Sequence, residues 1–523
     1  MGIFLLFLIF FSLPLVADEL PIGFTEEELS RKHEIFLMGR STDPPSAPIR
    51  NIAEYEKMQG VIIRYPLGIS TDLIAEISED VNIYCLVSSS LQSNAFNLME
   101  NNGVYMDNVE FIIGPTDSYW TRDYGPWWVV DGNNNMSIVD FTYNRPRPND
   151  NDAPLKISDF FNIPYFSTDL IHAGGNYMTD GLGISASSDL VYTENDISDE
   201  EVLQTVEDYY GINTYHVVSD PNNTYIDHID CWGKYLSPTK VLIREVPPSH
   251  EQYEQIEQTA NYFEQTSNKW GEPWELFRIY TPQNQPYTNS LILNNKVLVP
   301  ITGSSWDAQA ISTYESALPG YEVLGFSGSW ESTDALHCRI KGIPDLEMLQ
   351  LFHNPINDST YPGDLGYEVN IQISPLSGEG LINDSLLLFW KNNDMVNWNL
   401  EPLVSVDSQS TGIHKQGWIP PQTSDSEIQY YLKAADSSGR IEHHPISGYH
   451  QFLALPTDVC QQWILGDLDN SQSITVLDIL LLADQVMAEI SVGLCPPTIA
   501  DINEDGFVNV VDIIYLTNLI LYP

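Results

Sequence analysis

Three short segments combine ionisable or nucleophilic side chains with aromatic neighbours, and together they could perform covalent chemistry on a cation. The segments are residues 117–127, 228–234 and 334–339. They supply a thiol (Cys338), an imidazole (His228) and two carboxylates (Asp123 and Asp230). Each of these residues alone has an ordinary structural interpretation, as a core residue or half of an ion pair. Together they form a set that nucleophilic catalysis by cysteine requires.

The two carboxylates indicate what this set could bind. His228 and Asp230 are two residues apart, so on a strand both side chains would line the same pocket. A planar guanidinium with five N–H donors is the side-chain cation that two carboxylates can hold bidentately, which would fix its central carbon for attack. A neutral hydroxyl attacks such a carbon poorly, so sulfur is the expected nucleophile. Because nearby carboxylates raise a thiol pKa, we expect the thiolate to form with His228 protonated or with the substrate cation bound.

The elements that must position these residues follow an α/β pattern, in which strand-like and helical stretches alternate up to about residue 360. Trp127–Val130 is followed by Asp131-Gly132, and Leu291–Leu293 by Asn294-Asn295, so hairpins are predicted and the sheet is not purely parallel. Short alternating strands in residues 361–455 predict a small β-sandwich. Residues 456–523 contain no Lys or Arg and form a third unit.

Composition excludes several classes of protein. The chain has 523 residues and a formal net charge of -50, a balance that repels phosphate backbones and argues against nucleic-acid binding. With 43% hydrophobic residues it has enough apolar side chain to fold. The apolar run at residues 3–11 predicts a signal peptide over residues 1–17, with an uncleaved membrane anchor as the alternative. No other stretch reaches the ~18 apolar residues that span a bilayer.

Residues 456–523, which we call the tail, contain two copies of one acidic pattern. Each copy is followed by an apolar stretch typical of a helix. Oxygen side chains at loop positions 1, 3, 5, 9 and 12 surround a hard cation such as Ca²⁺, and Gly506 permits the sharp turn at position 6. Gln472 replaces that glycine in the first copy, so we expect weaker binding there. Asx-rich turns before helices would explain one copy, but hardly two in register. The predicted metal-site residues are Asp467, Asp469, Ser471, Ser473 and Asp478, then Asp501, Asn503, Asp505, Phe507 and Asp512.

Residues 466–521 resemble a dockerin module. This resemblance implies two bound Ca²⁺ ions and a cohesin-type partner. Cys460 and Cys495 flank the first repeat and could form a disulfide, a question that the sequence leaves open, whereas Cys85 is predicted to be a core residue.

The three segments, together with residues 143–150 and 174–177, resemble bacterial peptidylarginine deiminases of the guanidine-modifying superfamily. The resemblance runs from Glu54 to about Asp345, and the β-sandwich after it resembles the immunoglobulin-like domain of that family. It implies a five-bladed α/β propeller in residues 18–360, an immunoglobulin-like domain in residues 361–455 and a dockerin-like domain in residues 456–523.

The resemblance also implies a role for each site residue. Cys338 would be the nucleophile, His228 the general acid/base, Asp123 and Asp230 the guanidinium ligands, and Asn289 a supporting amide. The reaction would pass through a covalent thiouronium and release ammonia and citrulline, without a cofactor. The remaining implied residues would bind a C-terminal arginine, by its α-carboxylate (Arg145 and Arg147) and by packing of its stem (Trp120 and Tyr225).

A secreted enzyme that converts the arginine of peptides to citrulline is therefore the leading hypothesis. An agmatine or other small-guanidine deiminase is the alternative, although agmatine has no carboxylate and should not need Arg145 and Arg147. A non-catalytic surface-binding module is a third, and the complete set of thiol, imidazole and two carboxylates speaks against it.

Overall fold

The computed structural model describes residues 19–356, 359–363, 365–406, 412–456, 464–469, 471–488, 497–503 and 507–521. The predicted signal peptide, the predicted ligand Asp505 and the pair Cys460 and Cys495 lie outside these residues. Among the helices that are described, none is long and apolar enough to cross a membrane.

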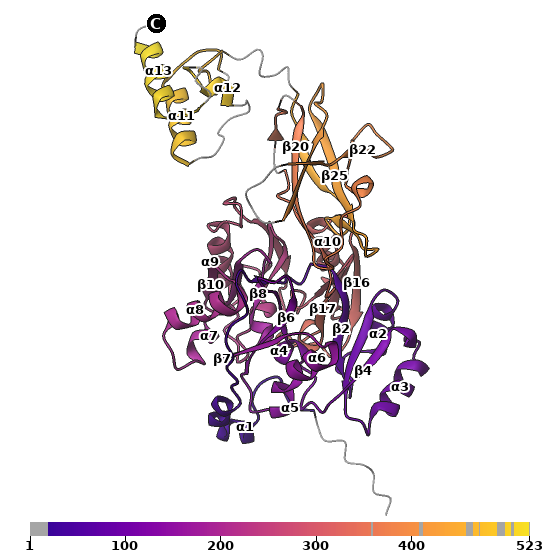
Figure 1. Ribbon diagram of the computed structural model, residues 1–523. Coiled ribbons are helices and arrows are strands. Elements are labelled where there is room, and N and C mark those ends of the chain that lie inside the picture. The colour runs from indigo at the N-terminus through magenta and orange to yellow at the C-terminus, as the bar shows by residue number, and fades with distance from the viewer. Residues whose placement is uncertain are drawn as a thin grey trace, which may run out of the picture.

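The strands of the described residues up to 345 form five small sheets (Figure 1). In spatial order they are β1 (Arg50–Asn51), β5 (Trp127–Val130), β6 (Met136–Tyr143) and β7 (Tyr165–His172); β10 (Thr214–Val218), β9 (Ile184–Ser188) and β8 (Met178–Thr179); β11 (Gly233–Ser237), β12 (Lys240–Glu245) and β13 (Glu275–Tyr280); β14 (Leu291–Leu293), β15 (Lys296–Ile301) and β16 (Glu322–Ser327); and β17 (Lys341–Pro344), β2 (Met58–Arg64), β3 (Asn82–Val87) and β4 (Val109–Ile113).

All five sheets share one plan, in which a strand pairs antiparallel with a second strand that pairs parallel with a third. A parallel pair needs a crossover, and helices supply it. The predicted α/β pattern and both predicted hairpins, β5–β6 and β14–β15, are confirmed. The crossover helices are α2 (Thr71–Ser78), α5 (Pro148–Asn151), α6 (Ala153–Phe161), α7 (Leu190–Thr193), α8 (Asp199–Tyr210), α9 (Tyr253–Glu264) and α10 (Asp307–Ala317), while α3 (Gln92–Asn101) and η2 (Met106–Asn108) lead into β4.

Local sequence explains where these helices begin and end. In α8, the Ser198 hydroxyl accepts the Glu201 N–H while the Glu201 carboxylate accepts the Ser198 N–H, which completes a capping box. Gly211 ends this helix with φ +70°, a left-handed conformation that glycine adopts without strain. Val202 and Val206 are buried on the side of α8 that faces the sheet.

In every sheet a short turn precedes the strand that pairs antiparallel in the shared plan, and these turns lie close together. The turns are α4 (Thr121–Tyr124) before β5, η3 (Gly174–Asn176) before β8, η4 (Ile229–Cys231) before β11, residues 286–290 before β14, and η5 (His337–Arg339) before β17. Contacts join α4 to η3 and η5, and η3 to η4. Each sheet therefore presents one turn to a common central region.

The second unit has two facing sheets of mostly antiparallel strands, drawn in orange in Figure 1. In β20 the predicted alternation is present, because Val369 and Ile371 are buried whereas Glu368 and Asn370 are exposed. The sheet already begins at β18, ahead of the predicted boundary at residue 361, because Leu349 pairs with Pro375 of β20. The sheets are β18 (Leu349–Phe352), β20 (Tyr367–Pro375), β24 (Ile413–Ile419) and β23 (Val404–Ser405), and β19 (Ser359–Thr360), β27 (His450–Ala454), β25 (Ser426–Ala435), β21 (Leu387–Asn392) and β22 (Asn399–Pro402), with β26 (Ile441–His444) on β25.

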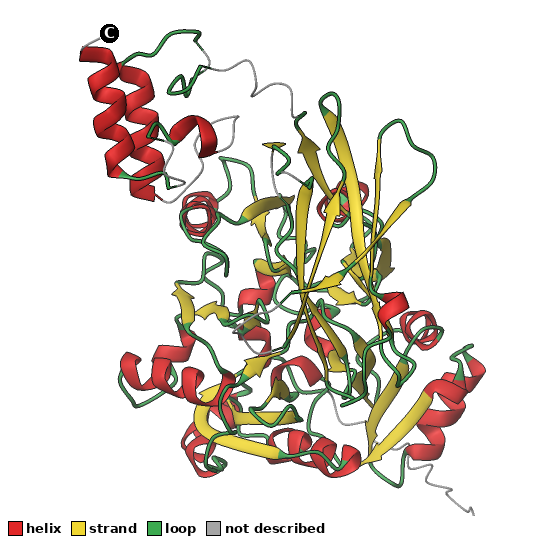
Figure 2. Cartoon of the chain, turned by 45° about the horizontal axis from the view of Figure 1, so that its top comes forward, coloured by secondary structure: helices red, strands yellow, loops and turns green. Residues whose placement is uncertain are grey.

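The remaining elements lie at the two ends of the chain and in one loop. The C-terminal unit consists of α11 (Val476–Ala488), α12 (Pro497–Ala500) and α13 (Val510–Leu521), and α11 packs against α13 (Figure 2). At the N-terminal end lie α1 (Glu26–Ser30) and η1 (Lys32–Leu37), while η6 (Asn383–Ser385) belongs to the second unit.

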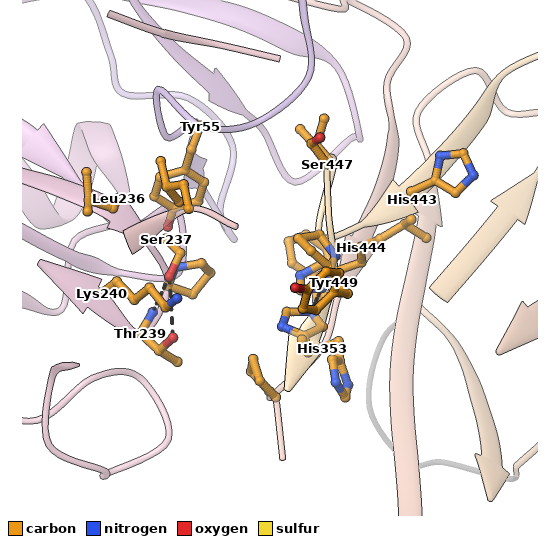
Figure 3. A pocket seen from close by; sticks show the side chains of 18 of the residues that line it. Tyr55, Leu236, Ser237, Thr239, Lys240, His353, His443, His444, Ser447 and Tyr449 are labelled. Atoms are coloured by element: carbon orange, nitrogen blue, oxygen red, sulfur yellow. Dashed lines mark hydrogen bonds between the residues drawn. The ribbon is translucent and has the colours of Figure 1, made fainter. Parts of the chain in front are cut away.

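A cavity of about 690 Å³ lies between the first and second units (Figure 3). One wall carries Tyr55 and Lys240, and the opposite wall carries His353 and His444. The His353 Nδ1–H donates to the Asn370 carbonyl, and its Nε2 pairs with a tyrosine hydroxyl. Burial lowers the pKa of His353 to about 4 and that of His444 to about 3, so both rings are neutral. The hydrogen bonds of His353 therefore stay within the second unit, where they fix its ring on this wall of the cavity.

Candidate active site

The thiol of Cys338 lies in η5, fully buried, and an amide from another sheet holds it. Asn289 Nδ2 lies 3.2 Å from Cys338 Sγ, and Asn289 Oδ1 accepts the backbone N–H groups of His337 (2.9 Å) and Cys338 (3.3 Å). One asparagine thus fixes both the backbone and the sulfur of the nucleophile turn. The structure brings these two predicted residues together.

The other three predicted catalytic groups converge next to Gly175 of η3. A Cβ atom built on Gly175 would lie 2.6 Å from Asp123 Oδ1, 2.8 Å from His228 Nδ1 and 3.2 Å from Asp230 Oδ2. Asp230 Oδ2 is also 3.7 Å from Cys338 Sγ. Only glycine leaves this space open to polar atoms, and residues from four different sheets border it. The arrangement forms a small polar pocket beside a thiol.

The expectation that His228 and Asp230 share one face of a strand is wrong. His228 is extended but Asp230 lies in the one-turn helix η4. The alternation rule assumed a continuous strand, whereas β11 begins only at Gly233, after the turn. The two side chains meet because the turn packs against η3.

Several polar atoms in this pocket lack partners within the described residues. Asp123 Oδ1 and both ring nitrogens of His228 are buried without a hydrogen bond, and the pair of Asp123 Oδ1 and His228 Nδ1 is 3.6 Å apart. A buried polar atom without a partner costs free energy, so unpaired groups that face one point indicate a site shaped for a ligand. These acceptors suit a ligand rich in N–H donors.

Burial and neighbouring charges shift the protonation of the cluster. Burial, with Asp230 as the next cause, raises the pKa of Asp123 well above its usual range. Burial also lowers the pKa of His228 to about 4, so the imidazole is neutral at pH 7. The expected rise for the thiol is found, since burial, Asp230 and the other acids raise the pKa of Cys338 well above its usual range. The free site therefore favours a neutral thiol.

A buried charge network behind Asp230 was not predicted from the sequence. His337 Nδ1 lies 2.7 Å from Asp230 Oδ2, and its Nε2 lies 2.6 Å from Glu54 Oε2. Glu54 also pairs with Arg122 Nη2 (2.7 Å) and Lys234 Nζ (2.8 Å). Burial is the largest influence on Asp230 and opposes its ionisation, but the His337 hydrogen bond and the charges of His337, His228 and Lys234 together lower its pKa. The adjacency of His337 and Cys338 is the one sequence signal that could have identified this network.

The two predicted carboxylate-binding arginines are occupied by the N-terminal end of the described chain. Arg147 donates to both carboxylate oxygens of Glu28, from Nε at 2.7 Å and from Nη2 at 3.2 Å. Arg145 donates from Nε to the Ile22 carbonyl at 3.0 Å and lies over the Phe24 ring at 4.4 Å. Both arginines are buried, so in this conformation neither is open to a substrate.

The two predicted aromatic residues differ in position. Trp120 is buried in the core, one residue before α4, and its Nε1 has no partner among the described residues. Tyr225 is 68% exposed, and its ring covers Gly23. Only Trp120 is enclosed as a pocket residue would be, because Tyr225 lies on the outside of the loop that leads to His228.

The first acidic loop has the geometry of a cation site. Oxygens of Asp467, Asp469 and Asp478 lie within 4.8 Å of one another, and Asp467 Oδ2 is buried without a hydrogen bond in the described residues. Ser471 and Ser473 pair with each other beside them. Carboxylate oxygens in this arrangement are ligands that Ca²⁺ accepts, so the donor set fits that ion. The apolar core of the C-terminal unit joins Leu468 and Ile502, which lie in the two loops, to Leu482 of α11 and Leu516 of α13.

The second loop repeats the hydrogen bonds of the first. Asp478 accepts N–H groups from Leu468, Asp469 and Thr475, and Asp512 accepts those from Ile502, Asn503 and Asn509. Asp501 and Phe507 are described in this loop as well. Gln472 takes φ +63° at the position that Gly506 holds in the second copy. This left-handed conformation is costly for a residue with a Cβ atom.

Known proteins resemble the first unit in both sequence and fold. A Mycoplasma capricolum subsp. capricolum protein named "Putative agmatine deiminase" is 25% identical over 292 residues, which cover 47% of this chain and 78% of that protein. The agmatine deiminase of Medicago truncatula is 23% identical over 327 residues, covering 51% and 85%. The structure of the Enterococcus faecalis agmatine deiminase aligns with a TM-score of 0.52 at 17% identity, over 58% of this chain and 99% of that one, and shows that the fold is shared.

Two family models match the chain. Residues 465–521 match the dockerin type I domain, in agreement with the paired acidic loops. Residues 54–344, more than half of the chain, match the Porphyromonas-type peptidyl-arginine deiminase model and include the predicted thiol, imidazole and both carboxylates. The chain therefore belongs to the Porphyromonas-type peptidyl-arginine deiminase family, whose members are hydrolases that act on carbon–nitrogen bonds.

Proposed function

We propose that this deiminase converts the guanidinium of a C-terminal peptide arginine to the urea of citrulline, with release of ammonia. The observation that carries the proposal is the convergence of Asp123, His228 and Asp230 on the space beside Gly175, next to the Cys338 sulfur. Two carboxylates on opposite sides of this space can hold the N–H groups of one guanidinium. The sulfur then faces its central carbon.

The proposed reaction has two stages. The Cys338 sulfur adds to the guanidinium carbon, and a C–N bond breaks as one nitrogen leaves as ammonia. His228, within reach of this space, transfers the proton that the leaving nitrogen requires. Water then adds to the thiouronium carbon with His228 as the base, the C–S bond breaks, and citrulline and the free thiol are released. The sum is one guanidinium and one water giving one urea and one ammonium ion.

The pKa shifts favour substrate-assisted formation of the thiolate. Because burial lowers the pKa of His228 to about 4, its imidazole does not supply the positive charge that a thiolate needs in the free enzyme. A bound guanidinium cation supplies that charge beside the sulfur and neutralises the nearby acids. We therefore favour proton loss from Cys338 after the substrate binds.

Arg145 and Arg147 provide the specificity in this proposal. Arg147 already binds a carboxylate in the structure, that of Glu28, so its guanidinium is placed to hold the α-carboxylate of a C-terminal arginine. Arg145 is close enough to Asp123 and His228 to change the pKa of both residues. Arg145 thus lies beside the catalytic cluster.

Citrulline release from two matched peptides tests the function. We expect rapid turnover of a peptide that ends in arginine with a free carboxylate, at least 10-fold slower turnover of one with internal arginine, and none by the Cys338→Ala variant. Removal of a nucleophile costs many orders of magnitude in rate, which makes the variant a clean control. Absence of citrulline from both peptides, with no alkylurea formed from agmatine, would exclude the proposal.

Agmatine deiminase activity is the second candidate, and a specific observation favours it. In the structure Arg147 is already neutralised by Glu28, and agmatine has no carboxylate that would compete for this arginine. Curated relatives of the first unit also carry the name agmatine deiminase. Conversion of agmatine with no conversion of either peptide would select this candidate.

We propose domain limits and folds that follow the sheets. The five sheets, each contributing a turn to one centre, are what a five-bladed propeller requires, and this unit would span residues 18 to about 346. The two facing sheets from β18 to β27 support an immunoglobulin-like sandwich up to residue 455. The dockerin-like domain would follow from residue 456.

We also propose export and a cohesin-type partner, both supported by the dockerin match. Apolar side chains are exposed at equivalent positions after the two loops. They are Val476, Leu477 and Leu480 in α11 and Val510, Val511 and Ile514 in α13. Exposed apolar residues on a small domain are typical of a protein-binding surface.

Calcium removal should affect the tail without affecting catalysis. Asp467, Asp469 and Asp478 would hold the ion in the first loop, and the catalytic pocket contains no comparable set among the described residues. With EGTA we expect loss of hydrogen-exchange protection in α11 and α13 and citrulline release within about 2-fold of its original rate. In an Asp467→Ala variant, EGTA should cause a smaller loss of hydrogen-exchange protection in α11, because the first loop has already lost a ligand for the ion. Loss of activity without loss of tail protection would contradict this division.

A further inference from the structure

A short segment at the N-terminal end of the described chain binds both specificity arginines. We call residues 19–28 the strap. Arg147 donates from Nη2 to the carbonyls of Pro21 at 2.7 Å and Gly23 at 3.0 Å, in addition to its pair with Glu28. Its Nη1 is buried and has no partner among the described residues. The arginine thus has the two N–H groups of Nη1 left for a further acceptor.

The strap also packs against the loop that leads to His228. A Cβ atom at Gly23 would lie 2.7 Å from the Tyr225 ring and 3.8 Å from Ile226 Cδ1, so this glycine packs directly on the residues that precede His228. Cys338 and Asp123 are 0% and 1% exposed. A substrate therefore cannot reach the thiol in this conformation, and the covering residues must move.

Glu28 carries two separable functions in the strap. Its Oε2 accepts the Thr25 N–H at 2.8 Å, and its backbone N–H donates to the Thr25 hydroxyl, which makes the capping box of α1. Its negative charge pairs with Arg147, a guanidinium that is 1% exposed. Burial opposes ionisation of Glu28, but the Arg147 hydrogen bond lowers its pKa, so the carboxylate is charged at neutral pH. Glutamine would keep the cap and lose the charge.

We infer that Glu28 is a specificity-determining residue whose carboxylate competes with a substrate carboxylate for Arg147. The inference rests on the proposed function, in which Arg147 binds the α-carboxylate of a C-terminal arginine. A substrate with a free carboxylate next to its guanidine-bearing residue takes over Arg147, and the strap then loses its strongest tie. A substrate without this carboxylate does not displace Glu28 and gains no affinity from Arg147.

Steady-state kinetics with a matched pair of variants tests this competition. Glu28→Gln is compared with Glu27→Gln, whose side chain in the same helix is 82% exposed. The substrates are a peptide ending in arginine and the same peptide with a C-terminal amide. We expect Glu28→Gln to lower the KM of the free-carboxylate peptide about 10-fold, because glutamine carries no charge to compete with the substrate carboxylate for Arg147. The KM of the amide should change less than about 2-fold, and Glu27→Gln should change neither.

Equal changes for both peptides, or a higher KM for the free-carboxylate peptide, would overturn the inference. Since Glu28→Gln leaves a buried arginine unpaired and could impair folding, hydrogen exchange on the full-length Cys338→Ala protein provides a second test. The free-carboxylate peptide should accelerate exchange in residues 19–31, and the amide should not. Unchanged or slower exchange with both peptides would overturn the inference. Absence of turnover by the unmodified enzyme would instead reject the proposed function, and the exchange result would remain interpretable.

Discussion

Asp123→Asn should abolish most of the activity and at the same time raise the stability of the protein. Asp123 is 1% exposed, and its Oδ1 faces the space beside Gly175 without a partner in the described residues. Loss of one of two carboxylates that hold a buried guanidinium costs about 3 to 5 kcal/mol, or roughly 10²- to 10⁴-fold in kcat/KM. Citrulline assays at subsaturating substrate measure this loss.

The stability change has the opposite sign because the Asp123 carboxyl is difficult to ionise in the folded chain. Its folded pKa is raised by burial and by Asp230, so the folded state binds more protons than the unfolded state at pH 7. The loss of folding free energy caused by Asp123 is absent below its unfolded pKa near 4. It grows as pH rises, to at most about 4 kcal/mol at pH 7. Asn removes this cost, so the urea midpoint of the variant should exceed that of the unmodified protein at pH 7.

The gain in stability should shrink toward zero at pH 4, where the carboxyl is protonated in both the folded and the unfolded state. Asp107→Asn, at an exposed residue of η2, should change neither activity nor stability. A lower urea midpoint for Asp123→Asn at pH 7 would show that Asp123 is a structural acid and not a functional one.

Glu54→Gln should destabilise the first unit severely. Glu54 bonds to Arg122, Lys234 and His337, and none of these three partners is more than 5% exposed. Removing one partner from a buried charge network leaves uncompensated charges and costs about 3 to 5 kcal/mol. We expect a corresponding fall in the free energy of unfolding at pH 7, measured by urea titration.

The pH dependence of this effect follows from the pKa of Glu54. Burial opposes ionisation, but His337, Lys234 and Arg122 lower the pKa well below its usual range. The stabilisation is therefore fully present above the unfolded pKa near 4.5 and is lost as pH falls through the folded pKa. The difference between Glu54→Gln and the unmodified protein should be constant from pH 6 to 8 and shrink under acid conditions.

Glu275→Gln is the matched control, because Glu275 is 58% exposed and pairs with Lys240 at 3.7 Å. A surface pair of this kind contributes about 0 to 1 kcal/mol. If Glu54→Gln were no more damaging than this control, the network would not support Asp230.

Much of the architecture could be predicted because it depends on local pattern. The hairpin β5–β6 was predicted from Asp131-Gly132, although its loop covers residues 131–135 and turns at Asn134 with φ +61°. The repeat of the acidic loops follows from oxygen spacing. The proximity of the thiol, the imidazole and the two carboxylates could be predicted from residue types, since few chemistries require all of them together. The five-sheet plan could not, because pairings such as Ile62 with Lys341 join the two ends of the unit and leave no local signal.

The parts of the site that were missed depend on tertiary contacts. Glu54 and His337 lie far apart in the chain, and only packing makes them neighbours. Thr25 and Glu28 have the ordinary spacing of a helix start, which gave no indication that the glutamate also binds Arg147. Asp230 was assigned to a strand because the alternation rule does not detect a one-turn helix.

The pairing of β2 with β17 has a consequence for how the enzyme is made. Residues 58–64 leave the ribosome early, but the strand that pairs with them, residues 341–344, comes from the far end of the unit. Cys338 lies just before that strand, so the nucleophile is placed only when this last ladder forms. Ladders between such distant segments form slowly. The nascent or partly folded chain is therefore expected to be chemically inactive. In a series of nascent chains of increasing length, those that end before residue 341 should bind no guanidine.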